Sequence, residues 1–204
     1  MTVRLTLCLG LVCVLEACSF FGKAAPMHPR YFQPEGETPS RARALQHLGG
    51  PALRLGHVAG SSFLRERIAY HVTEHELGVY DERRWTERPE DYFRRALARS
   101  LFEERGLSNV VSGSAPVLDV ELTDFSELLG PTHAVRVRAQ VSLVDQRAVR
   151  LERSFSVEQA VAKGADFALV AAAMSQALER SVAQIADDVE RELTANVKAT
   201  APSP

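Results

Sequence analysis

Cysteine is scarce in this sequence and is confined to its beginning. The three cysteines are Cys8, Cys13 and Cys18, so residues 19–204 contain none. A domain built from those residues has no cysteine pair for a disulfide, a metal site or redox chemistry. The position of Cys18 therefore needs an explanation other than packing or pairing.

An excess of one charge is also missing. The chain has 24 basic and 26 acidic residues, for a formal net charge of −2. The arginine-rich segment 81–105 has seven arginines and seven acidic residues, so its own net charge is zero. A nucleic-acid surface would carry one sign of charge. We therefore expect no nucleic-acid partner, and we interpret segment 81–105 as a solvated face with paired ions.

The usual catalytic signatures are absent as well. There is no Gly-x-Ser-x-Gly elbow, no phosphate loop and no dinucleotide glycine fingerprint. His71 and His75 are four residues apart, but they flank a predicted hairpin turn, where that spacing does not bring ligands together. His57, Ser61 and Ser62 have no spacing that indicates acyl transfer. We expect no enzyme activity, no cofactor and no metal.

No apolar run is long enough to span a membrane. The run Leu5–Leu15 has 11 residues, which is about 16 Å of helix and about half of a hydrocarbon core. It is followed by Leu15-Glu16-Ala17-Cys18, which resembles the lipoprotein cleavage box, although Glu16 departs from the small residue usual there. We predict a signal peptide at 1–17 and a lipidated Cys18. The alternative is an ordinary secretory signal cut after Ala24, with loss of Cys18.

The remaining sequence predicts one domain with extended ends. Residues 18–50 are rich in Pro and Gly and predict a tether, with a first strand near 31–32. Residues 51–195 contain the periodic segments, and the apolar fraction of 46% is sufficient for a core. Residues 196–204 are small and polar and predict a flexible tail.

Periodicity indicates the fold class. A strand near Leu53–Val58, a hairpin with a four-residue loop at 73–76 and three strands of alternating polarity between Leu118 and Val157 are expected. Pro89 begins a first helix, and a second helix of about 27 residues starts near Phe167. Together these elements predict an α+β fold: a two-layer sandwich with a mostly antiparallel sheet and both helices packed on one face.

One segment is a candidate for partner contact. Residues Val79–Pro89 contain the single tryptophan, Trp85, close to Tyr80 and Arg84. Trp, Tyr and Arg are enriched where proteins bind partners. The alternative, which we favour, is that Trp85 plugs the end of the sandwich before Pro89.

Several of these segments together resemble the ABC-type transport auxiliary lipoprotein family. The resemblance rests on Leu64-Arg65-Glu66-Arg67-Ile68-Ala69-Tyr70, Val79-Tyr80, Arg84-Trp85-Thr86-Glu87-Arg88-Pro89 and Leu97-Ala98-Arg99-Ser100-Leu101. It extends from about Tyr31 to Leu193, and Arg84-Trp85-x-x-x-Pro89 is its most specific part.

The resemblance implies a non-catalytic lipoprotein in the cell envelope. It would face the periplasm, with the outer membrane as the expected location, because Ser19 replaces the aspartate that retains many lipoproteins at the inner membrane. Its expected partners are an MCE-domain protein with the permease and ATPase of an ABC lipid transporter, and members can also self-associate into rings. Two alternatives stay open: a structural lipoprotein of another envelope assembly, such as secretion or lipopolysaccharide export, and a lipid-binding carrier.

Overall fold

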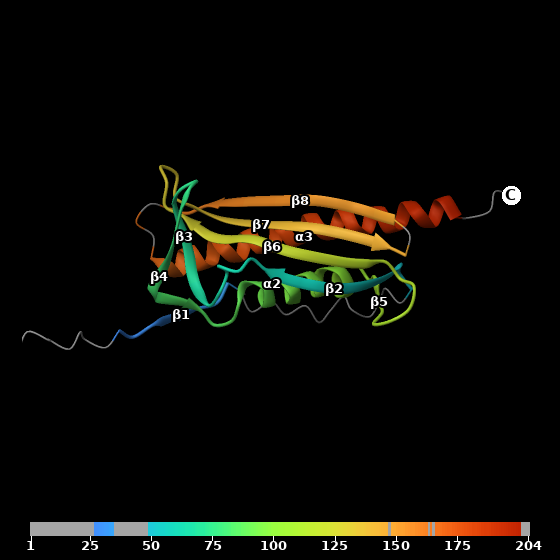
Figure 1. The fold of residues 1–204 in the computed structure, drawn as a ribbon, viewed down its shortest axis with the longest axis horizontal. Helices are drawn as coiled ribbons and strands as arrows, with labels where there is room; N and C mark the ends of the chain where they lie inside the picture. Colours follow the sequence, from blue (N-terminus) through green and yellow to red (C-terminus); the bar gives the residue numbers. More distant parts are fainter. Residues whose placement is uncertain (1–26, 35–48, 147, 163, 165, 201–204) are drawn as a thin grey trace, which may run out of the picture.

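A curved mixed sheet and two long helical segments form two layers in the computed structural model of the chain (Figure 1). The structure describes residues 27–34, 49–146, 148–162, 164 and 166–200. The predicted signal peptide 1–17, Cys18 and most of the predicted tether 18–50 lie outside these residues. The strands are β1 (Arg30–Phe32), β2 (Ala52–Gly60), β3 (Arg67–Thr73), β4 (Glu76–Trp85), β5 (Ser108–Asn109), β6 (Val117–Leu128), β7 (Ala134–Asp145) and β8 (Ala148–Ala160).

Strand β6 organises the sheet. One edge of β6 pairs antiparallel with β7, which pairs antiparallel with β8. The other edge pairs parallel with two strands placed end to end, β2 along the first half of β6 and β3 along its last residues. Beyond these, β4 pairs antiparallel with β3, β1 pairs parallel with β4, and β5 pairs parallel with β2. The longest ladders are antiparallel, and the fold is α+β as the sequence predicts.

Both helical segments cover the same face of the sheet. Helix α2 (Pro89–Ala98) begins at Pro89 as predicted and continues as the π-helical segment η2 (Arg99–Glu104). The chain then turns at Gly106, whose φ of 68° favours glycine. Helix α3 (Phe167–Thr200) lies behind β7 and β8 (Figure 1) and has 34 residues, or about 51 Å.

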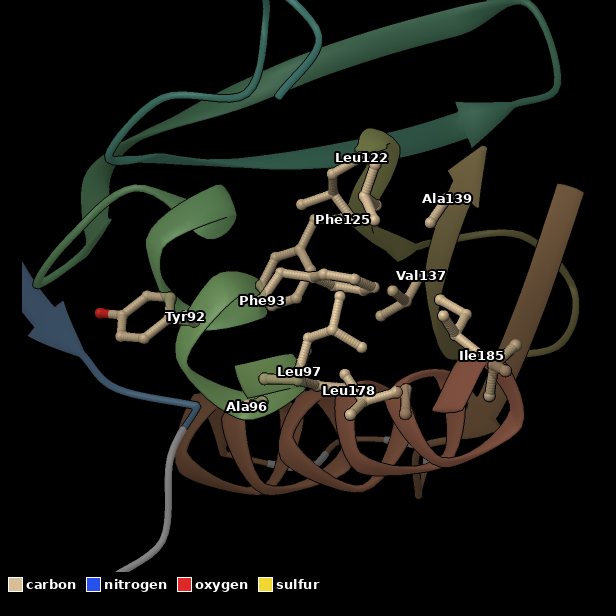
Figure 2. Packing of buried hydrophobic residues seen from close by; sticks show 14 of the residues in the cluster. Tyr92, Phe93, Ala96, Leu97, Leu122, Phe125, Val137, Ala139, Leu178 and Ile185 are labelled. Atoms are coloured by element: carbon tan, nitrogen blue, oxygen red, sulfur yellow. The ribbon is translucent and has the colours of Figure 1, made fainter. Parts of the chain in front are cut away.

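The interior between the layers is filled with side chains. Figure 2 shows Phe93 and Leu97 of α2 meeting Phe125 of β6 and Val137 of β7, while Leu178 of α3 closes the layer from the helical side. All five side chains are almost fully buried. Burying one large apolar side chain stabilises a fold by about 1.5–3 kcal/mol, so this layer supplies the main stabilisation.

Three boundaries differ from the sequence-based expectation. The hairpin loop has two residues between β3 and β4, not four, because Thr73 pairs with Glu76 inside the ladder. Strand β4 continues through the charged residues to Trp85, so the second strand of the hairpin extends into the segment 81–105. Helix α3 continues through Thr200, into the segment 196–204 predicted as a tail.

An irregularity in β6 changes which side chains are buried. The register with β7 shifts between Leu122 and Asp124. Before the shift, Leu118, Val120 and Leu122 are buried and the intervening residues are more exposed. After it, every residue from Asp124 to Glu127 is buried, including three polar ones. A bulge of this kind redirects side chains, and it places a polar cluster inside the protein.

Candidate partner-binding surfaces

Trp85 belongs to the core. Its side chain is 1% exposed, and its ring meets Phe125 of β6 edge-on with 5.5 Å between ring centroids. The ring of Phe167, the first residue of α3, lies 6.4 Å away. Trp85 pairs with Phe32 of β1, so the short first strand covers the end of β4. The ring therefore has no surface to offer a partner in this structure.

Tyr80 lies at the border between core and surface. Its hydroxyl donates to Oε2 of the buried Glu127 at 2.7 Å. Burial, followed by this hydrogen bond to a carboxylate, raises the pKa of Tyr80 far above its ordinary value. The Arg83 guanidinium lies 4.3 Å from the Tyr80 ring centroid and 4.6 Å from that of Phe167. These contacts hold Tyr80 in place as a neutral phenol.

Arg84 lies on the opposite face of β4 from Trp85, because successive residues of a strand point to opposite sides. It is half-buried, with Tyr31 of β1 as its neighbour on one side and Arg67 of β3 on the other. The structure therefore spreads the three residues predicted as a contact over core, border and sheet. A contact surface on that face would consist of Arg84 with the exposed Tyr31 beside it.

The polar cluster after the bulge was not predicted from the sequence. Asp124 and Arg136 are each buried, and Nε of Arg136 donates to Oδ2 of Asp124 at 2.7 Å. The hydroxyl of Ser126 donates to Oδ1 of Asp124 at 2.6 Å. Nη1 of Arg136 also lies 3.5 Å from Glu74 in the hairpin turn and 3.8 Å from Glu158 of β8. The cluster ties the β3–β4 hairpin to the middle of the sheet.

The two histidines considered for metal binding lie in different surroundings. His71 is in β3 with Nε2 3.6 Å from Oδ2 of Asp124, whereas His75 is exposed in the turn. His133 joins the neighbouring network, with 2.6 Å between its Nε2 and Oε1 of Glu127. Within the described residues there is no group of three or more His, Cys, Asp or Glu side chains arranged to hold a metal ion.

The outer face of the sheet contains a polar hollow. It has a volume of about 640 Å³ and lies over β2, β6, β7 and β8. Asp119, Glu121 and Glu152 supply carboxylates to its wall, and the backbone N–H of His57 donates to Oδ1 of Asp119 at 2.6 Å. This is the wet face that the alternating pattern predicts. Its side chains suit contact with a polar partner better than they suit a lipid.

Another hollow, of about 300 Å³, lies at the surface between the helical segments and is bordered by Arg99, Glu104 and Glu179. Among the described residues, the layer between sheet and helices is closely packed with apolar side chains (Figure 2). In the described part of the chain, no helix has the length and apolar character needed to cross a membrane.

Comparison with known proteins identifies relatives of this sandwich. The sequence matches, over residues 33–186, the model of a family described as "ABC-type transport auxiliary lipoprotein component". No match is found among curated proteins.

Three solved structures share the fold. A protein from Xanthomonas campestris is 20% identical with a TM-score of 0.68, covering 83% of this chain and 99% of its own. An uncharacterized protein is 18% identical with a TM-score of 0.61, covering 81% and 99%. A hypothetical protein from Chlamydia trachomatis is 11% identical with a TM-score of 0.53, covering 72% and 99%. At these identities the likeness concerns the fold alone.

Proposed function

Because the chain belongs to the family of ABC-type transport auxiliary lipoprotein components, we propose that it is a non-catalytic docking subunit of an ABC transport system in the cell envelope. The family match carries this proposal, since it covers residues 33–186 and so spans almost the whole sandwich. The packed interior of the described residues supports it, because a domain filled with apolar side chains in this way meets a partner at its surface.

The anchor would be the acylated Cys18. Eight residues separate Cys18 from Met27, the first described residue. A flexible chain of that length has an r.m.s. reach of about 15 Å. Stable anchoring needs more than one acyl chain, which the lipoprotein modification supplies. The sandwich would thus stay within one or two nanometres of its membrane, facing the periplasm, with the outer membrane as the proposed location.

The partner would be an MCE-domain protein working with an inner-membrane permease and ATPase to move a lipid. The auxiliary subunit would hold that partner near the anchored membrane. Its polar sheet face and its strand edges are the surfaces that fit a protein partner, because they present hydrogen-bonding groups and not a lipid-sized apolar cavity.

The test is crosslinking in the native envelope. Full-length protein with a C-terminal tag is crosslinked, purified and analysed by mass spectrometry, both for captured proteins and for the mass of the peptide that begins at Cys18. We expect an acylated Cys18 and capture of an MCE-domain protein with its permease. A Cys18→Ala variant should keep the fold but lose the membrane fraction.

Other results would replace the proposal. Capture of a secretion or lipopolysaccharide-export assembly without an ABC transporter would make the protein a structural subunit of that assembly. Co-purification of a stoichiometric lipid would indicate a carrier. An unmodified start near Ala25 would remove the anchor.

A further inference from the structure

Strand β8 is an open edge of the sheet. The N–H and C=O groups of successive residues point alternately toward β7 and away from it. Its odd-numbered residues bond toward β7, since the next odd residue, Val161, donates its N–H to His133 O at 2.9 Å. Its even-numbered residues point away from β7, since Glu158 O accepts a hydrogen bond from the Arg180 side chain of α3 at 2.9 Å. The register of β8 is regular from Leu151 to Ala160, so this alternation holds along that length.

One end of this edge is covered, and its middle is not. Arg180 covers Glu158 O and the side chain of Gln159. Before that end, the N–H and C=O groups of Glu152, Ser154 and Ser156 face outward, and the described part of the chain gives them no hydrogen-bond partner. Proteins usually block such edges, because an unpaired strand adds another strand.

A groove lies beside this stretch, between β8 and α3. Its volume is about 330 Å³, and its walls include Arg153 and Phe155 from β8 and Gln184, Asp188 and Arg191 from α3. A second hollow of about 450 Å³ continues along α3 and shares Asp187 and Arg191 with the first.

Two arginines in the walls of the groove share one carboxylate. Nη1 of Arg153 and Nη1 of Arg191 both donate to the carboxylate of Asp188, the second at 2.8 Å. Their side chains are nevertheless 58% and 68% exposed. A guanidinium has five N–H donors in a fixed plane, so each arginine keeps donors for an incoming group.

We propose that an extended segment of the partner protein adds to the middle of β8 as a further strand and places alternate side chains in the groove against α3. This rests on the proposed docking function and assigns it a surface. Backbone pairing with Glu152, Ser154 and Ser156 gives affinity, and pockets for alternate side chains give selectivity. Because the groove's carboxylates and guanidinium groups balance, neutral acceptor side chains such as Asn, Gln, Ser or Thr fit it best.

The first test reads the register of the added strand. A photo-crosslinking amino acid is placed in the full-length protein at Glu152, Ser154 or Ser156, with Glu103 on η2 as the control position. We expect the three products to map to one segment of another protein, advancing by two residues for each step along β8, with no such product from Glu103. Products that map to β8 of a second copy, or that show no common register, would overturn the proposal.

The second test removes one outward N–H without touching the fold. Ser154→Pro loses a donor that β7 does not use and places a ring where the added strand would lie, whereas Ser154→Ala keeps the N–H. We expect Ser154→Pro to reduce the crosslink from Ser156 at least about tenfold and Ser154→Ala to leave it unchanged. The buried Trp85 gives native fluorescence in both if the fold is intact. Equal crosslinking in the two variants would overturn the proposal.

The crosslinks distinguish a wrong docking surface from a wrong function. A stepped register into a protein outside any ABC transport system would contradict the proposed function and leave the strand-addition surface standing. Capture of the transport partner from Glu103, with no product from β8, would keep the function and reject this surface.

Discussion

Removing the carboxylate of Asp124 should be among the most destabilising single changes in this protein. Asp124 accepts a charged hydrogen bond from Arg136 and a second bond from Ser126, both at short distance and both shielded from water. In Asp124→Ala the Arg136 guanidinium keeps, among the described residues, Glu74 and Glu158 at 3.5 and 3.8 Å and on exposed side chains. Removing one partner of a buried ion pair costs about 3–5 kcal/mol. We expect a loss of that size in the free energy of unfolding.

A double-mutant cycle separates this cost from general damage. Arg136→Met removes the cation and retains much of the side-chain volume. We expect Asp124→Ala and Arg136→Met together to cost about 1–3 kcal/mol less than the sum of the two single changes, because the double variant leaves no unpaired charge. The assay is urea unfolding followed by the fluorescence of Trp85, the single tryptophan, which is buried in the fold and exposed on unfolding.

The control is Gln140→Ala, an exposed residue on the same outer face of β7, where a change within about 0.5 kcal/mol is expected. If Asp124→Ala costs less than about 1 kcal/mol, or if the two changes are additive, the pair is not isolated from water. The polar cluster behind the β3–β4 hairpin would then be open to water.

Three further predictions concern other parts of the sandwich. Phe93→Ala should lower stability by about 3–5 kcal/mol in thermal unfolding, because its ring is fully buried between α2 and the sheet. Burial opposes ionisation of Asp188, but the hydrogen bonds from Arg153 and Arg191 prevail and lower its pKa. Asp188 therefore adds stability above about pH 4 that is lost as the pH falls, and Asp188→Asn should reduce the acid dependence of urea midpoints. Gly106→Ala should cost about 1 kcal/mol, because Gly106 has a φ of 68°.

Each of these has a clear contrary result. A Phe93→Ala variant as stable as the parent would mean that the core is not closely packed there. An unchanged acid profile in Asp188→Asn would assign the acid dependence to other carboxylates. A neutral Gly106→Ala would mean that the turn after η2 relaxes without cost.

The sequence predicted the secondary structure best in elements with one solvent-exposed face and one buried face. Strand β6 up to Leu122, β7 from Val137 and β8 from Phe155 alternate between buried and more exposed residues. Pro89 starts α2 because a proline at the first helical position loses no hydrogen bond. Helix α3 is visible as a stripe from Phe167. In these stretches each residue's polarity indicates its side of the layer.

Tertiary contacts concealed two features from the sequence. The segment 81–105 was interpreted as a solvated face with paired ions, and its first residues continue β4, where Arg83 stacks on Tyr80 and Asp81 pairs with Arg67 of β3. Asp124 was not singled out, yet it lies in a buried polar cluster after the bulge in β6, bonded to Arg136 of β7. Neither feature has a local signal, since Arg67 and Arg136 belong to other strands.

The predictions for the contact surfaces also succeeded in part. Trp85 was favoured as a plug for the end of the sandwich, and its ring is in the core. The β8 edge was not singled out, because a strand's position at an edge depends on the order of pairing and not on its own sequence. Cys18 lies outside the described residues, and its lipidation stays a prediction from the cleavage box.

The order of strand pairing also determines how the protein resists tension applied at its N-terminal side. A pull on β1 passes first through three residue pairs to β4, then through the β3–β4 hairpin, and then through three residue pairs to β6. The ladders behind them, β6–β7 and β7–β8, are several times longer. Because β2 and β3 meet β6 end to end, peeling β3 away leaves the pairing of β2 intact. The part that yields first under load therefore lies at the N-terminal end of the described sandwich, while the longer ladders up to the β8 edge keep their pairing.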